Sequence, residues 1–146
     1  MIAVDTNLLV YAHRQDSDFH SAARSRIESL AVGRAKWAVP WPCIHEFLAV
    51  VTHPRIYRTP TPMPRAMQVV RAIASLPNLD LLCETDGYLD HLESLALAGR
   101  VQGPMVHDTR IAALCLAHGV AELWSADRDF SRFPGLIVRN PLPDPG

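Results

Sequence analysis

The sequence of 146 residues has few of the features that mark secreted, membrane-bound or zinc-binding proteins. Its three cysteines, Cys43, Cys83 and Cys115, lie far apart in apolar stretches, so we expect buried thiols and neither a disulfide framework nor a zinc site. No run approaches the roughly 18 uncharged apolar residues that a membrane span needs. The first residues lack the basic stretch and long apolar run of a signal peptide, so we expect a cytoplasmic protein that does not enter a membrane.

The sequence also lacks a surplus of positive charge. The formal net charge is −1, which counts weakly against a nucleic-acid partner, and Lys36 is the single lysine among 14 basic residues. What is present is an ordinary globular composition, with 49% hydrophobic and 20% charged residues. This length and composition predict one domain over residues 1–146 with one hydrophobic core and a loose proline-rich tail over residues 141–146.

Short apolar runs alternate with helical patterns along the whole chain. Buried strands are expected at residues 2–5, 37–40, 79–84, 122–127 and 136–140. Helices are expected over residues 8–13, with Thr6 and Asn7 as caps, and over residues 20–32, 42–51, 65–76, 86–98 and 109–118. The segment 53–64 holds four prolines and is predicted to be an extended loop. The alternation predicts an α/β fold with a parallel sheet covered by helices on both faces.

Acidic residues stand at the ends of these predicted elements. Asp5, Asp127 and Asp129 follow expected strands, and Asp108 opens an expected helix. Ligands of open parallel sheets bind outside the carboxyl ends of the strands, so Asp5 and Asp127 are expected to face one crevice with Asp108 nearby. Carboxylates this close repel one another unless protons or cations intervene, and an all-oxygen site suits Mg²⁺ or Mn²⁺. The pattern therefore indicates metal-assisted phosphodiester hydrolysis.

Each of these acids also has a purely structural interpretation. Asp5 and Asp108 suit helix N-caps, and Asp127 and Asp129 suit a turn. The metal-site hypothesis rests on the shared edge of the sheet, and on no single residue. Helical periodicity places Glu46 on the side of its helix away from the apolar residues, so spacing alone predicts a solvent-facing side chain.

Four segments give the chain a resemblance to a known family. They are IAVDTNLLVYA at the start, the helix around Glu46, HDTRIAALCLAHG in the third quarter and SADRDFSRF near the end. In this order and spacing they resemble the PIN-domain nucleases of the VapC toxin type, over nearly the whole chain. The resemblance implies a three-layer α/β/α sandwich with a central parallel sheet. It also implies an Mg²⁺- or Mn²⁺-dependent endoribonuclease.

The resemblance further implies roles for individual residues. Matched by position, the catalytic and metal-binding acids are Asp5, Glu46, Asp108 and Asp127. Asn7 and Ser125 match polar positions that hydrogen-bond the acids, and Asp129 matches a more peripheral acid. Arg110 follows Asp108 closely enough to contact a phosphate, although a solvated helix residue is an equally simple interpretation.

Partners are implied by the same resemblance, and two alternative functions stay open. A protein of this type has an RNA substrate, a small VapB-like antitoxin and a second copy of itself in a homodimer.

One alternative function is that of an aspartyl phosphatase of the haloacid dehalogenase kind, because IAVDTN is similar to its opening motif. That chemistry wants an aspartate where Asn7 stands and a lysine, and Lys36 begins a predicted strand. The other is a catalytically inactive PIN-fold binding module, against which the complete set of four acids counts.

The proline-rich loop carries one further candidate feature. Arg55, Tyr57 and Arg58 combine cationic and stacking groups, as contacts to single-stranded RNA do. A plain exposed loop explains the same residues.

Overall fold

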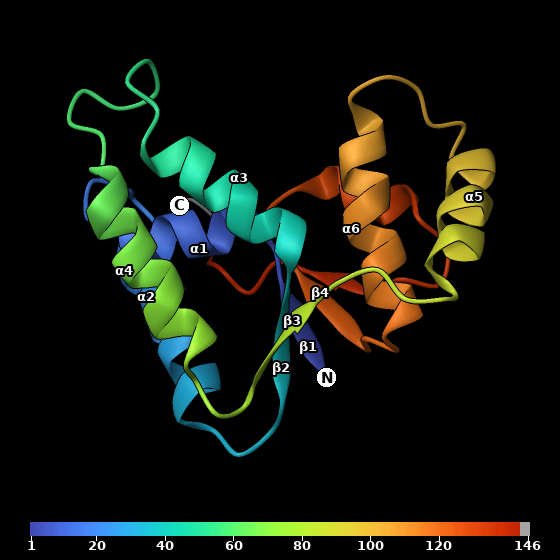
Figure 1. The fold of residues 1–146 in the computed structure, drawn as a ribbon, viewed down its shortest axis with the longest axis horizontal. Coiled ribbons are helices and arrows are strands. Elements are labelled where there is room, and N and C mark those ends of the chain that lie inside the picture. The colour runs from blue at the N-terminus through green and yellow to red at the C-terminus, as the bar shows by residue number, and fades with distance from the viewer. Residues whose placement is uncertain (144–146) are drawn as a thin grey trace.

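The computed structural model, which describes residues 1–143, is built around a central sheet (Figure 1). Its strands are β1 (Ile2–Val4), β2 (Trp37–Pro40), β3 (Leu79–Leu82), β4 (Glu122–Trp124) and β5 (Val138–Arg139). All neighbouring strands pair in parallel, in the order β3-β2-β1-β4-β5. Every residue of β2 is buried, as expected for a strand covered on both faces.

Helices cover the sheet on two sides and confirm the three-layer α/β/α sandwich with a central parallel sheet. They are α1 (Thr6–His13), α2 (His20–Val32), α3 (Trp41–Val51), α4 (Met63–Ala74), α5 (Tyr88–Ala98), α6 (Met105–Ala117) and the 3₁₀ helix η1 (Arg128–Arg132). Helices α1, α2 and α4 lie on one side, and α5 and α6 lie on the other (Figure 1). No helix among residues 1–143 is both long and apolar enough to cross a membrane.

The boundaries differ from the sequence predictions at helix starts and at the ends of β1, β3, β4 and β5, which are shorter than predicted. Helix α4 begins at Met63, inside the segment predicted as loop, because prolines suit the first turn of a helix. Helix α6 begins at Met105, with Pro104 at the N-cap, so Asp108 lies inside the first turn. The prediction that Asp108 opens the helix was therefore wrong. Asp5 is the N-cap of α1.

Burial corrects two further predictions. Cys43 and Cys115 are buried as predicted, but Cys83 directly follows β3 and is exposed. The predicted loose tail is packed at Leu142, which is only 8% exposed and belongs to the hydrophobic core. Residues 144–146 of that predicted tail lie outside the described residues.

The strand order determines where a ligand can bind. From the central strand β1 the chain moves outward through β2 and β3, and it then returns to add β4 and β5 on the other side. The strand order thus reverses between β1 and β4. In open α/β sheets this reversal leaves a crevice outside the carboxyl ends of the two strands. Asp5 and Ser125 are the residues that directly follow β1 and β4.

Candidate functional site

Strand register brings Asp5 and Ser125 together. Val4 pairs with Trp124, and the Asp5 amide donates a hydrogen bond to the Trp124 carbonyl at 2.9 Å. The next residue on each strand therefore leaves the sheet at the same edge. The Ser125 hydroxyl donates to Asp5 Oδ2 at 2.7 Å, which joins two residues that are 120 positions apart in the sequence.

Asp5 is a fixed, nearly buried carboxylate. Asp5 is only 4% exposed. Its Oδ1 accepts a hydrogen bond from the Thr6 amide at 2.8 Å and lies 3.6 Å from the Cys43 sulfur. Burial raises the pKa of Asp5, the hydrogen bonds from Ser125 and Thr6 oppose that rise, and the charge of Glu46 adds to it. The N-cap interpretation of Asp5 is confirmed, and the same residue also lines the pocket described below.

Asn7 connects helix α1 to the loop after β4. Its Nδ2 lies 3.4 Å from both Asp5 Oδ2 and Ser125 Oγ, and its Oδ1 accepts the Ala126 amide at 3.2 Å. Ser125 Oγ in turn accepts the Asp127 amide at 3.0 Å. These bonds hold the backbone that carries Asp127 against the start of α1.

Glu46 joins the site through a residue that the sequence analysis missed. Glu46 is exposed on α3, as helical periodicity predicts, yet its Oε2 accepts the Thr6 hydroxyl at 2.7 Å. Thr6 is only 6% exposed and lies in the first turn of α1. No spacing in the sequence signals this contact, because it depends on how α1 and α3 pack.

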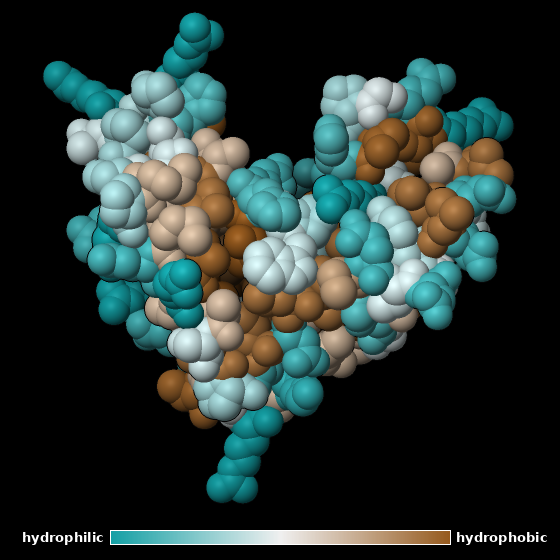
Figure 2. Space-filling view, in the orientation of Figure 1, coloured by the Kyte–Doolittle hydropathy of each residue, from teal (hydrophilic) through white to brown (hydrophobic). Residues whose placement is uncertain are grey.

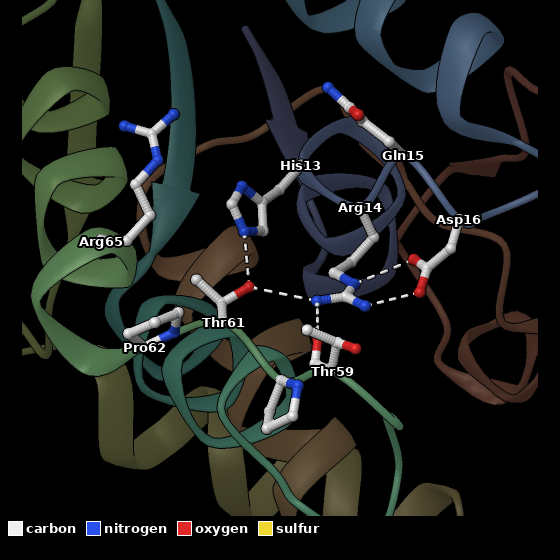
Figure 3. Close-up of a pocket in the computed structure, with 9 residues that line it drawn as sticks. His13, Arg14, Gln15, Asp16, Thr59, Thr61, Pro62 and Arg65 are labelled. Atoms are coloured by element: carbon white, nitrogen blue, oxygen red, sulfur yellow. Dashed lines mark hydrogen bonds and ion pairs between the residues drawn. The ribbon is translucent and has the colours of Figure 1, made fainter.

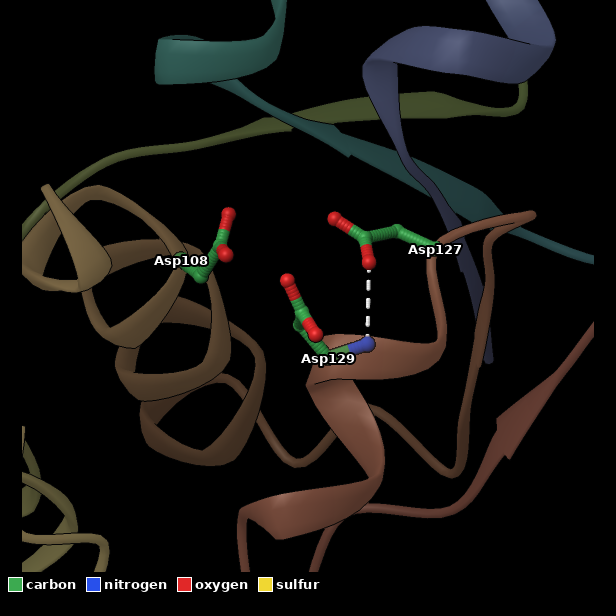
Figure 4. A group of neighbouring side chains, drawn as sticks. All are labelled: Asp108, Asp127 and Asp129. Carbon is green, nitrogen blue, oxygen red and sulfur yellow. Dashed lines mark hydrogen bonds between the residues drawn. The ribbon is translucent and has the colours of Figure 1, made fainter.

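Three aspartates form a compact cluster beside these residues (Figure 4). Asp108 on α6, Asp127 before η1 and Asp129 within η1 each offer one carboxylate oxygen, and these oxygens lie within 4.8 Å of one another. The Asp129 amide donates to Asp127 Oδ1 at 2.9 Å, so the tight turn of η1 brings both acids to one side. The sequence analysis treated Asp129 as peripheral, whereas the fold places it beside Asp108 and Asp127.

Mutual repulsion is concentrated at Asp108. Burial and then, in decreasing order, the charges of Asp127, Asp5, Asp129 and Glu46 together raise the pKa of Asp108 from its ordinary value of 3.8 to about 6. The Asp108 carboxylate is thus repelled by the charges of all four of these acids. A cation bound among them would relieve this repulsion, and an all-oxygen donor set fits a hard divalent ion.

The acids line a pocket of about 260 Å³ at the switch point. Its charged and polar lining consists of Asp5, Thr6, Asn7, Glu46, Asp108 and Asp127, and its remaining wall consists of Val10, Tyr11, Val50 and Tyr57. Glu46 also borders a neighbouring cavity between α3 and α6, lined in addition by His107 and Arg110. Figure 2 shows the molecule hollowed between the lobe of α1 to α4 and the lobe of α5 and α6.

Arg110 lines this neighbouring cavity and is already paired. Its Nη2 lies 3.1 Å from Glu84 Oε1, and both side chains are well exposed. A phosphate contact by Arg110 would require it to leave or share this partner.

A family model and curated relatives cover the chain almost completely. The model described as "PIN domain" matches residues 2–136. Ribonuclease VapC43 of Mycobacterium tuberculosis is 34% identical over 142 residues, which cover 97% of this chain and 96% of the relative. Ribonuclease VapC48 of the same organism is 31% identical over 138 residues, covering 94% and 95%.

Solved structures have the same fold. VapBC2 from Rickettsia felis, bound to a DNA fragment from its promoter, aligns with a TM-score of 0.71 and 20% identity over 96% of this chain and 98% of that one. VapC20 of Mycobacterium tuberculosis, described as a sarcin-ricin loop cleaving toxin, aligns with a TM-score of 0.68 and 14% identity over 94% and 97%. At these identities the structures support the fold, and the family model and curated relatives establish the family. The chain belongs to the PIN domain family, and the curated relatives it matches there are VapC ribonucleases.

Proposed function

We propose that this protein is an Mg²⁺- or Mn²⁺-dependent endoribonuclease that acts as the toxin of a toxin–antitoxin pair. The observation that carries the proposal is the meeting of carboxylates from three separate parts of the chain at the switch point of the sheet. Asp5, Asp108 and Asp127 line one pocket, and Asp129 adjoins Asp108 and Asp127. The curated relatives named VapC ribonucleases support the reaction class.

The acids of the site form the group that would hold the ion. Asp5, Glu46, Asp108 and Asp127 line one pocket and would hold the ion, and Asp129, whose carboxylate lies beside Asp108 and Asp127, would join them. When bound, a divalent cation supplies an activated water and offsets charge that develops on the phosphate oxygens. Asp5 is buried and accepts hydrogen bonds from Thr6 and Ser125, so the orientation of its carboxylate toward the ion would be fixed.

Glu46 is suited to handle water and protons. It is exposed, it lines the pocket, and one of its oxygens is held by the Thr6 hydroxyl. The other oxygen is free of any bond to the described residues 1–143 and can accept a proton from a water molecule that approaches the phosphate. Thr6 is thus a positioning residue that selects the orientation of the Glu46 carboxylate.

Expression in a bacterial host tests the proposed function. Wild-type protein is expected to arrest growth and to create new RNA ends, and Asp108→Asn is expected to do neither. Glu93→Gln provides a matched control, because Glu93 is an exposed acid on α5 outside the pocket lining. Equal arrest by wild type and Asp108→Asn would refute the proposal. An absence of new RNA ends in the wild type would instead favour a catalytically inactive binding module.

Partners follow from the same proposal. The structural neighbours include VapBC assemblies, which supports a small VapB-like antitoxin as a partner. We propose that this antitoxin covers the acidic pocket. The proposal also includes a homodimer and a cytoplasmic location. Family membership favours this assignment over an aspartyl phosphatase. Co-expression with the protein encoded beside this chain is expected to restore growth. Mass measurement of the purified protein alone is expected to give a dimer, and a monomer would remove the dimer from the proposal.

A further inference from the structure

One wall of the acidic pocket consists of aliphatic and aromatic side chains. Val10, Tyr11, Val50 and Tyr57 line the same space of about 260 Å³ as the carboxylates. The acids repel the phosphates of an RNA strand, so affinity for RNA has to come from other parts of the site. Aromatic faces supply such affinity, because every nucleobase has a flat surface that stacks on them.

Tyr57 is the member of this wall that packs against a charged side chain. The guanidinium carbon of Arg14 lies 3.9 Å from the centre of the Tyr57 ring, which is a cation–π stack. Arg14 is itself fixed by an ion pair with Asp16, by the Thr59 carbonyl at 2.9 Å and by Thr61 Oγ1 at 3.3 Å (Figure 3). Its side chain is only 11% exposed. The Tyr57 ring is therefore braced on one face by a fixed guanidinium, without any ligand.

The loop that carries Tyr57 is also ordered by its own backbone. The Tyr57 amide donates to the His53 carbonyl at 3.2 Å, so the ring sits at a defined turn between α3 and α4. Its hydroxyl forms no hydrogen bond with the part of the chain that the structure describes. The side chain thus contributes its ring to the pocket and does not depend on its hydroxyl for anchorage.

We propose that Tyr57, braced by Arg14, is the base-binding platform of this nuclease site. The base of a nucleotide next to the scissile phosphate stacks on the Tyr57 ring, against the apolar surface of Val50 and Tyr11. The inference rests on the proposed ribonuclease function and adds a substrate-binding residue to it. Only an unpaired base can be splayed out in this way, so the platform takes single-stranded RNA.

Cleavage kinetics with three variants test the platform. The substrate is a fluorescently labelled pool of single-stranded RNA 12-mers of randomised sequence, with Mn²⁺ present. Tyr57→Phe keeps the ring and is expected to keep kcat/KM within about twofold. Tyr57→Leu keeps apolar bulk without a flat face and is expected to raise KM about 5- to 150-fold with a smaller change in kcat, the range that loss of one base stack produces. Arg14→Lys removes the planar brace and is expected to fall between them.

A modified substrate separates stacking from a general effect on folding. After the cleaved bond of one oligonucleotide has been mapped, abasic nucleotides replace the base on either side of it. One of the two abasic substrates is expected to bind more weakly than the intact oligonucleotide to protein that keeps Tyr57. The same substrate is expected to bind to Tyr57→Leu as well as the intact oligonucleotide does. Binding is measured by fluorescence anisotropy in an Asp108→Asn background, so the comparison does not need catalysis.

The outcomes distinguish the inference from the proposed function. Wild-type values of KM and affinity for Tyr57→Leu would overturn the platform while leaving the ribonuclease assignment intact. Equal weakening of wild type and Tyr57→Leu by the abasic substrates would also overturn it. No cleavage of any RNA by the wild type would instead overturn the proposed function. Loss of antitoxin binding by Tyr57→Leu with unchanged RNA binding would reassign the wall to the protein partner.

Discussion

Crowding of carboxylates predicts that neutralising one acid stabilises the metal-free protein. The pKa of Asp108 rises from its ordinary value of 3.8 to about 6, mainly through burial and then through the charge of Asp127. A carboxyl whose folded-state pKa is raised favours folding when it is protonated. Its contribution to stability is complete below pH 3.8 and is lost as the pH rises through about 6. In EDTA, wild-type stability should therefore fall between pH 4 and pH 7.

The size of this effect follows from the pKa shift. A shift from 3.8 to about 6 is 2.2 pH units, which corresponds to about 3 kcal/mol at most. Asp108 is only partly buried, so solvent screening reduces this to about 1.5 kcal/mol. Asp108→Asn removes the charge, and no hydrogen bond to the Asp108 carboxylate exists within residues 1–143 to be lost. For a chain of this length we expect the melting temperature at pH 7.5 to rise by about 3 to 6 °C.

Thermal unfolding in EDTA at pH 4.5 and pH 7.5 measures the prediction. The gain from Asp108→Asn should be large at pH 7.5 and close to zero at pH 4.5, where wild-type Asp108 is protonated. Glu93→Gln should show no such pH-dependent gain. Adding Mg²⁺ at pH 7.5 should stabilise wild type more than the variant, because a ligand of the folded state stabilises in proportion to its binding. An equal change at both pH values, or destabilisation at pH 7.5, would refute the crowding of acids around Asp108.

Three further variants test other parts of the site and core. Thr6→Val removes the hydroxyl that holds Glu46 and keeps its volume, so kcat for RNA cleavage should fall about tenfold with KM unchanged; an unchanged kcat would remove Thr6 as a positioning residue. Asp129→Asn should weaken Mn²⁺ binding in a calorimetric titration at least about tenfold, and wild-type affinity would exclude Asp129 as a ligand. Phe47→Ala, at a fully buried position, should lower the free energy of unfolding by about 3 to 5 kcal/mol in urea titrations, and a loss below 1 kcal/mol would contradict the core.

Sequence patterns predicted most of the strands and the shared position of Asp5 and Asp127 at one edge of the sheet. The apolar runs at β1 and β4 predicted that Asp5 and Asp127 share an edge, because parallel strands present their carboxyl ends together. The fold class followed from the alternation of strands and helices, which needs only local pattern and the rule of parallel connections. The strand register then explains why Ser125 reaches Asp5.

Other features depend on packing that no local pattern encodes. Glu46 is solvent-facing by periodicity, and only the approach of α3 to α1 brings it to Thr6. Asp129 was treated as peripheral because the resemblance matches it to a peripheral acid of the family, whereas the turn of η1 brings its carboxylate close to Asp108. Cys83 was expected in the core because its neighbours are apolar, but β3 ends at Leu82 and leaves the thiol exposed.

Cleavage of single-stranded RNA by purified protein tests the central claim most directly. The assay compares wild type, Asp108→Asn and Glu93→Gln in EDTA and in Mn²⁺. We predict cleavage by wild type and Glu93→Gln in Mn²⁺ alone, and a loss of at least about 100-fold in Asp108→Asn, as removal of a group that supports metal chemistry should cause. Cleavage by wild type in EDTA, or equal cleavage by Asp108→Asn in Mn²⁺, would contradict a metal-dependent nuclease site at these carboxylates.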